Sequence, residues 1–242
     1  IRDRVHTKKE NNFMLTKEEL EGAYTAKTKA LILTSPSNPT GMISSLEDLQ
    51  MVADFAVSHD VFVISDEIYE KLIYDEGKKH ISIASLSKEI YDRTIVINGV
   101  SKSYAMTGWR IGFAAAPLEV AKLMASLQSH MASNPNSIAQ EATLAALEGP
   151  QDCVEEMCKE FKKRRDYIYE REEAILAELP GNNCGGCGYP GCDGLAAAIA
   201  KGEAPVNGCP VGGEPVGKVI AAIMGQEVVE TARQVAYVKC AG

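Results

Sequence analysis

Four short apolar runs alternate with amphipathic stretches along the first half of the chain. The runs predict strands at KALILTSP (29–36), VFVIS (61–65), TIVINGV (94–100) and RIGFAAA (110–116). Helical spacing of apolar positions predicts helices at 17–24, 45–58, 118–131, 136–148 and 151–176. The second of these helices starts with a capping-box-like pair, Ser45 and Asp48. Near-continuous apolar strands separated by helices predict an α/β fold with a mostly parallel sheet and helices on both faces.

Loops dominate the chain beyond Pro180-Gly181. Short helices are predicted there at 194–202 and 215–225, and an extended segment near Val235–Val238. The last 69 residues hold 13 of the 20 glycines and 5 of the 7 cysteines. This change in composition predicts a small, loop-rich module that something other than apolar burial holds together.

Bulk composition limits the classes of partner and compartment. A net charge of −8 argues against nucleic acid as a main partner. No apolar run approaches the length of a membrane span, and no signal peptide is visible. An odd number of cysteines without a secretory signal indicates a reducing, cytoplasmic compartment and favours metal ligation over disulfides.

Three polar motifs follow the first three predicted strands. They are SPSNPTG (35–41), SDEIYEKLIYD (65–75) and NGVSKSYAMTGWRIG (98–112). The carboxyl ends of parallel strands collect ligands, so the motifs are expected to converge on one site. Lys102 lies eight residues ahead of Arg110. That spacing suits a lysine that forms a Schiff base with an aldehyde cofactor beside an arginine that holds the cofactor's phosphate.

These motifs, in this order and spacing, closely resemble the class I and II aminotransferases, pyridoxal-phosphate enzymes of fold type I. The resemblance covers about residues 1–172 and implies a partial large, cofactor-binding domain. By this resemblance Lys102 would bond covalently to the cofactor and then move a proton from the substrate Cα to C4′. Asp66 would pair with the pyridine nitrogen and keep the ring protonated. Tyr69 completes the catalytic set.

The resemblance also implies a set of residues that bind the cofactor. Asn38 and Tyr69 would hydrogen-bond its 3′-oxygen, whereas Arg110 and Ser101 would hold its phosphate. Each residue alone has an ordinary structural reading. Asn38-Pro39 is also a turn dipeptide, Tyr69 also suits a core edge, and an aspartate such as Asp66 often caps a helix. The substrates implied are an amino acid and a 2-oxo acid, and the family forms homodimers.

Four cysteines form a second constellation, C-x2-C-x4-C-x16-C-P. Three ligands on one tight loop and a fourth from a distant turn predict a 4Fe–4S cluster on Cys184, Cys187, Cys192 and Cys209. Structural zinc is the main alternative, although it usually shows two C-x-x-C pairs. Free or disulfide-bonded cysteines are a further alternative.

The words LPGNNCGGCGYPGCDGLAAAIAKGEAPVNGCPVGGE resemble the iron–sulfur protein, designated B, of the Rnf ferredoxin:NAD oxidoreductase. That resemblance covers about residues 172–242 and implies a 4Fe–4S electron-transfer module. The module would lie at the cytoplasmic face of a membrane complex and would have a redox partner protein. The resemblance sets the predicted domains at 1–172 and 173–242.

We interpret the chain as a chimera of the two families, the alternative being a genuine bifunctional protein. The function predicted is an incomplete aminotransferase joined to a 4Fe–4S module. The alternatives are an iron–sulfur electron-transfer protein whose first domain is inactive, and a fragment without function.

Overall fold

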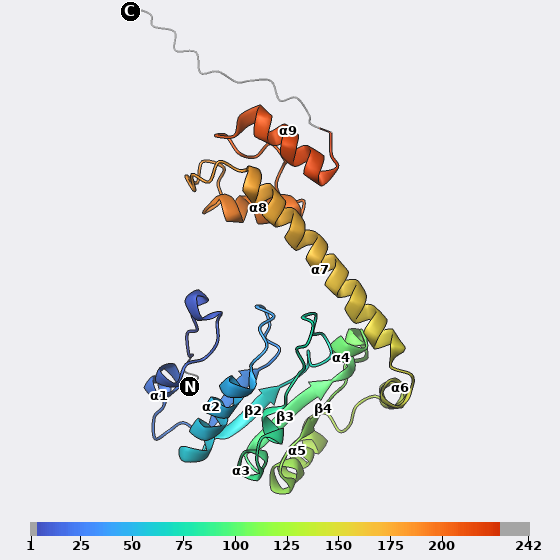
Figure 1. The fold of residues 1–242 in the computed structure, drawn as a ribbon. Coiled ribbons are helices and arrows are strands. Elements are labelled where there is room, and N and C mark those ends of the chain that lie inside the picture. Colours follow the sequence, from blue (N-terminus) through green and yellow to red (C-terminus); the bar gives the residue numbers. More distant parts are fainter. Residues whose placement is uncertain (1–3, 228–242) are drawn as a thin grey trace, which may run out of the picture. The chain divides into compact units, whose positions relative to one another are not determined.

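The computed structural model describes residues 4–227 and divides the chain into two compact units, Ile1–Lys159 and Glu160–Gly242 (Figure 1). Helix α7 (Asp152–Glu178) begins in the first unit and ends in the second. The predicted extended segment near Val235–Val238 lies outside the described residues. In the described part no helix combines the length and the apolarity that a membrane crossing requires.

A four-stranded sheet forms the centre of the first unit. Its strands, in spatial order, are β1 (Ala30–Thr34), β2 (Phe62–Asp66), β3 (Thr94–Gly99) and β4 (Gly112–Ala115). All four coincide with predicted strands. Strands β1, β2 and β3 are parallel, and β4 runs antiparallel to β3. The mostly parallel sheet is therefore confirmed.

The antiparallel pairing of β4 follows from its short connection to β3. The connection holds the single turn of α4 (Val100–Ser103), the 3-10 helix η3 (Thr107–Trp109) and a few residues on either side of η3. Antiparallel neighbours need no long crossover. The strands approach closely at Gly99, where a Cβ would lie 3.0 Å from Gly112 Cα and 3.1 Å from the Ile111 carbonyl oxygen. Glycine at position 99 permits this approach.

One face of the sheet carries the core of the first unit. The segments packed there are α1 (Lys17–Ala23), α2 (Leu46–Ser58), η2 (Ile83–Ser85) and α3 (Lys88–Tyr91). The predicted cap of α2 is present, because Ser45 Oγ accepts from the Asp48 N–H at 3.1 Å and Asp48 Oδ2 accepts from the Ser45 N–H at 2.8 Å. Leu49 and Val52 of α2 are 1% and 2% exposed and pack with Leu33 and Val63 of the sheet.

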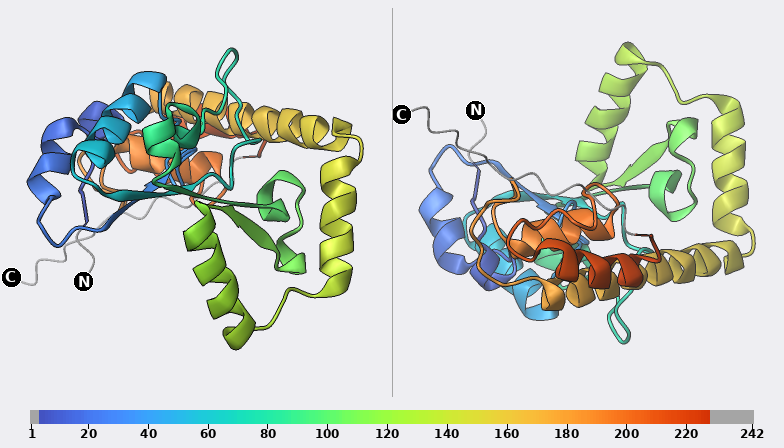
Figure 2. Two further views of the ribbon diagram at one scale, coloured as in Figure 1. Left: turned by 90° about the horizontal axis from the view of Figure 1, so that it is seen from below. Right: turned by 90° about the horizontal axis from the view of Figure 1, so that it is seen from above.

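The opposite face of the sheet carries α5 (Leu118–Met131), which Figure 2 shows on the other side from α2 and α3. Helices therefore lie on both faces, as predicted. This second cover is thin, because α5 has no buried residue and Ile32 and Phe62 remain 61% and 40% exposed. Helix α6 (Ser137–Glu148) follows, and η1 (Lys9–Asn11) lies near the start of the chain.

The second unit is small and built from helix ends and loops. Helices α8 (Cys192–Ala200) and α9 (Gly213–Met224) begin two residues before their predicted positions. Ile175 and Leu179, from the end of α7 and just beyond it, pack with Leu195 and Ile199 of α8 and with Ile220 of α9. This core draws only on residues from 175 onward. The predicted loop-rich module thus has a compact apolar centre of its own.

Candidate functional sites

The three polar motifs of the first unit begin at one edge of the sheet. Strands β1 and β2 pair Thr34 with Asp66, and β2 and β3 pair Asp66 with Ile97. The pairing continues past the strand ends, because the Ser35 N–H donates to the Asp66 carbonyl at 3.1 Å. Parallel pairing therefore brings the carboxyl ends of all three strands together, as the sequence predicts.

Three of the predicted residues lie close together at this edge. Asn38 Nδ2 donates to the Tyr69 hydroxyl at 3.2 Å. Lys102 Nζ lies 5.7 Å from the centroid of the Tyr69 ring, within cation–π range. Lys102 is half-buried on α4, directly after β3, and forms no hydrogen bond or ion pair with the residues that the structure describes. Its amine is therefore available to another group.

Asp66 ends β2 and is half-buried. Its Oδ1 accepts from the Ile68 N–H at 3.2 Å, and a turn rather than a helix follows. The helix-cap reading of this aspartate is therefore wrong. The carboxylate fixes the turn that leads from β2 to Tyr69.

Arg110 and Ser101 are not joined to the other predicted site residues by hydrogen bonds in the described part of the chain. Arg110 is exposed, has a left-handed φ of 53°, and donates from Nη1 to the Thr107 carbonyl at 2.8 Å. Ser101 is half-buried on α4 beside Lys102. Neither contacts Asn38, Tyr69 or Lys102 through a hydrogen bond within residues 4–227, so their phosphate-binding role stays a prediction.

Sequence reasoning missed a buried carboxylate next to Asp66. Glu67 is 3% exposed, and its Oε1 accepts from Ser65 Oγ at 2.9 Å and from Ser82 Oγ at 2.7 Å. Its Oε2 lies 2.8 Å from His80 Nε2. No periodic pattern marks a contact between residues 13 positions apart. The only signal was a second acidic residue directly after an apolar strand.

The hydrogen bonds around Glu67 decide its charge. Burial acts to raise the pKa of the Glu67 carboxyl. The three donated hydrogen bonds outweigh that effect, with His80 contributing most, and hold the pKa below its ordinary value. Glu70 lies near this pair, and the three residues form the one group of potential metal ligands within 4.8 Å in the described chain. Because both Glu67 oxygens are already bound, the group serves as a structural anchor for the β2 end.

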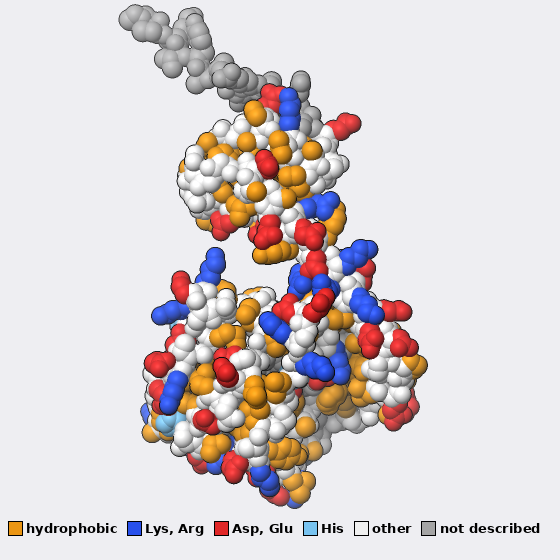
Figure 3. Space-filling view, viewed as in Figure 1, with side chains coloured by type: hydrophobic (Ala, Val, Ile, Leu, Met, Phe, Trp, Pro, Cys, Tyr) orange, Lys and Arg blue, Asp and Glu red, His pale blue; other side chains and the backbone are white. Residues whose placement is uncertain are grey.

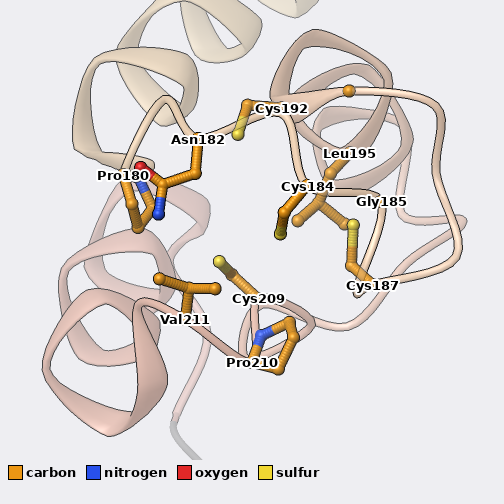
Figure 4. Close-up of a pocket in the computed structure, with 11 residues that line it drawn as sticks. Pro180, Asn182, Cys184, Gly185, Cys187, Cys192, Leu195, Cys209, Pro210 and Val211 are labelled. Atoms are coloured by element: carbon orange, nitrogen blue, oxygen red, sulfur yellow. The ribbon is translucent and has the colours of Figure 1, made fainter.

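The four predicted cysteines line one pocket of the second unit, with Pro180, Leu195, Pro210 and Val211 around them (Figure 4). Cys184 and Cys187 lie on the loop before α8, and Cys192 is the first residue of that helix. Cys209 is 8% exposed in the turn before α9, where its Sγ accepts from the Gly212 N–H at 3.3 Å. Figure 4 shows the four sulfurs arranged around a shared space.

Backbone N–H groups near two of the cysteines form hydrogen bonds. Cys192 is the first residue of α8, and its backbone N–H donates to Asn183 Oδ1 at 2.8 Å. The Gly212 N–H adds a hydrogen bond to sulfur. All six cysteines in the described part are free thiols, so no disulfide competes for these ligands there. Cys240 lies outside the described residues.

The four sulfurs are not tightly clustered in this structure. Tetrahedral zinc with Zn–S bonds of about 2.3 Å holds its sulfurs about 3.8 Å apart. Within residues 4–227, no three cysteine sulfurs lie within 4.8 Å of one another. Four cysteine thiols around one pocket form a donor set that fits an iron–sulfur cluster.

Comparison with known proteins agrees with both halves of this description. Residues 2–186 match the family described as "Aminotransferase class I and II", and residues 179–211 match the family described as "Putative Fe-S cluster". The chain belongs to the class I and II aminotransferase family. The iron–sulfur match includes all four predicted cysteines. The closer likeness to the Rnf iron–sulfur protein stays a prediction.

The relatives of this chain are longer proteins. The chain is 51% identical over 175 residues to an aspartate aminotransferase of Geobacillus stearothermophilus, covering 72% of the chain and 43% of the relative. An aspartate aminotransferase of Bacillus subtilis is 49% identical and is matched over the same fractions, 72% of this chain and 43% of the relative. The chain thus spans less than half the length of these curated relatives.

Solved aminotransferases share the fold of the first unit. The aromatic aminotransferase from Pyrococcus horikoshii superposes with a TM-score of 0.67 at 44% identity, covering 71% of this chain and 46% of that structure. The aspartate aminotransferase from Rhizobium meliloti gives 0.67 at 42% identity, covering 69% and 42%. The predicted aminotransferase resemblance is therefore confirmed.

Proposed function

We propose that the first unit is the pyridoxal-phosphate-binding part of an aminotransferase, an enzyme that moves an amino group between an amino acid and a 2-oxo acid. The observation that supports this most directly is the grouping of Asn38, Tyr69 and an unpaired Lys102 at the carboxyl edge of the parallel strands. When bound, pyridoxal phosphate supplies an electron sink for the substrate Cα.

The donor set fits that cofactor. Lys102 offers the only chemistry in the group that can bond an aldehyde, and its amine is free to do so. Asn38 and Tyr69 present an amide and a phenol, both hydrogen-bonded to each other and both able to orient a ring oxygen. Asp66, on the neighbouring strand end, offers the carboxylate that favours a protonated pyridine nitrogen.

In the proposed reaction Lys102 has two tasks. Its amine would hold the cofactor, and it would also serve as the base that takes up the proton of the substrate Cα. Arg110 and Ser101 would hold the phosphate, Arg110 through a bidentate contact. The matched relatives carry names for aspartate, asparagine and aromatic substrates, so the proposal names only the class.

An absorbance spectrum tests this proposal. Titration of the full chain with pyridoxal phosphate should give an absorbance band close to the visible range, and borohydride should remove this band. The Lys102→Ala variant should not show the band. Lys122→Ala is the matched control, because this lysine lies on α5 and pairs with Glu119. A wild-type chain without the band at saturating cofactor, or a Lys102→Ala chain that keeps it, would contradict the proposal.

We also propose that residues 173–242, within the second unit, form a domain that binds a 4Fe–4S cluster on Cys184, Cys187, Cys192 and Cys209 and passes electrons to a redox partner protein. The observation that supports it is the gathering of all four cysteines around one pocket. Anaerobic reconstitution should yield about four iron and four sulfide per chain. One zinc per chain and no iron would reject this cluster.

Two further features complete the proposal. The free thiols fit a reducing compartment, which we take to be the cytoplasm. The first unit would act as a homodimer, which sedimentation velocity of the purified chain measures directly. Lys and Arg side chains are interspersed with Asp and Glu on the face shown in Figure 3, which suits small charged substrates better than a nucleic-acid partner.

A further inference from the structure

Asn183 joins two parts of the cysteine loop. It immediately precedes Cys184, and its side-chain Oδ1 accepts a hydrogen bond from the Cys192 backbone N–H at 2.8 Å. The bond spans nine residues and closes the segment that carries Cys184 and Cys187 onto the start of α8. It therefore sets how far the first cysteine lies from the third.

This bond replaces a missing helix cap. The first N–H groups of a helix have no partner within the helix, and a side chain at the N-cap usually accepts from one of them. The N-cap of α8 is Gly191, which has no side chain to do so. A Cβ at Gly191 would meet Asp193 Oδ1 first and would also lie 3.2 Å from Asn183 Oδ1, so glycine leaves room for both side chains.

The backbone of Asn183 also favours this residue type. Its φ is 47°, in the left-handed region that most side chains avoid. Asparagine tolerates this conformation better than other residues that have a Cβ. Position 183 therefore requires two properties at once, a left-handed backbone and a side-chain acceptor, and asparagine supplies both.

We infer that Asn183 is a positioning residue for the cluster, and this inference rests on the iron–sulfur function proposed above. It acts through the Cys192 backbone and need not touch iron. By holding Cys184 and Cys192 at their separation before iron arrives, it lowers the cost of ordering the ligands. A loop without this bond opens more readily and releases the cluster faster.

Three variants of the full chain separate the two properties. Asn183→Gly keeps the left-handed backbone but loses the acceptor, Asn183→Asp keeps both, and Asn183→Ala loses both. Asn12→Gly is the matched control, because Asn12 also has a left-handed φ, 54°, but lies in the first unit. Each protein is reconstituted anaerobically and challenged with an iron chelator. The readouts are iron per chain, the rate of iron release and the midpoint potential.

The expected order of stability is specific to the hydrogen bond. Asn183→Gly should release iron about five-fold faster than wild type, the factor that one lost hydrogen bond implies. Asn183→Ala should release it at least as fast. Asn183→Asp should hold iron like wild type, at a more negative midpoint potential because of the added charge. Asn12→Gly should match wild type in every readout.

Three outcomes would overturn the inference. An Asn183→Gly chain that keeps its iron like wild type would overturn it alone. An Asn183→Asp chain that loses iron as fast as Asn183→Ala would show that the acceptor does not matter, and circular dichroism would check that α8 still forms. A wild-type chain that takes up no iron would overturn the proposed cluster and this inference with it.

Discussion

Replacing Glu67 by glutamine tests whether a buried charge anchors the strand end beside Asp66. The amide has nearly the same shape, and its oxygen can still accept from Ser65 and Ser82. Its NH2 group, however, would face His80 Nε2, which now lies 2.8 Å from a carboxylate oxygen. One of the two nitrogens must then lose its role as a donor.

The cost follows from the surroundings of the imidazole. If the proton moves to His80 Nδ1, it lies on a buried atom without a hydrogen-bond partner in the described structure. An unsatisfied buried donor costs about 1–3 kcal/mol, and the bond to a charged acceptor, worth about 1.5–3 kcal/mol, becomes a weaker bond between two neutral groups. The neutral amide is cheaper to bury than a carboxylate, which offsets part of this sum. We expect Glu67→Gln to lower the free energy of unfolding of the first unit by about 2–4 kcal/mol.

Urea unfolding followed by tryptophan fluorescence measures this loss. The chain has a single tryptophan, Trp109, so the signal reports the first unit. Glu70→Gln is the matched control. Its carboxylate is close by but pairs only weakly, 3.9 Å from Lys71 Nζ, and the change should stay within about 0.5 kcal/mol.

The pH dependence gives a second, independent reading. The folded pKa of Glu67 is lowered, so its ionised form adds stability above the unfolded pKa, and this stability is lost as pH falls through the folded value. The difference in the free energy of unfolding between wild type and Glu67→Gln should therefore have its full size at pH 7 and become smaller below about pH 4. A difference under about 0.5 kcal/mol at pH 7, or one that persists unchanged to pH 3, would refute the reasoning.

Three further changes test other parts of the structure. Ile175→Ala removes a side chain with 0% exposure from the core of the second unit and should cost about 2–4 kcal/mol there, seen by circular dichroism with the tryptophan transition unchanged. Gly99→Ala places a Cβ at 3.0 and 3.1 Å from main-chain atoms and should destabilise the first unit by about 1–3 kcal/mol in urea unfolding, whereas Gly22→Ala, with open space in a helix, should stabilise it slightly. Tyr69→Phe removes the hydroxyl that accepts from Asn38. It should raise the dissociation constant of pyridoxal phosphate about ten-fold in an absorbance titration and leave the free energy of unfolding unchanged. An unchanged dissociation constant would mean that the cofactor does not bind at Tyr69.

The elements of the first unit were predictable because their signals are local. Apolar runs marked all four strands, and the Ser45–Asp48 spacing marked the start of α2. The pairing direction of β4 was not predictable in this way, because it depends on how a short connection packs rather than on any pattern inside the strand. The same holds for α4, whose four residues are too few for a helical period.

The two candidate sites differ in how far sequence could define them. The cysteine pocket follows from one compact spacing pattern, and the structure gathers all four residues in it. The cofactor site required a family resemblance, because Asn38, Tyr69 and Lys102 come from three separate segments of the chain. Glu67 and His80 escaped both routes. Their contact arises from a loop path, and an acidic residue beside a strand has no distinctive period.

The two units are expected to respond separately to perturbation, and the composition of their cores is the reason. The core around α2 uses residues only up to Ile90, whereas the core around α8 uses residues only from Ile175 onward. Between them α7 carries a charged stretch with pairs such as Lys162–Asp166, which suits a helix that is polar around its circumference. The effects of substitutions that share no interaction partners add up in the free energy of unfolding.

Glu67→Gln should therefore leave iron content unchanged, and Asn183→Gly should leave pyridoxal phosphate binding unchanged. Coupling between these readouts would mean that the units share an interaction beyond their two cores.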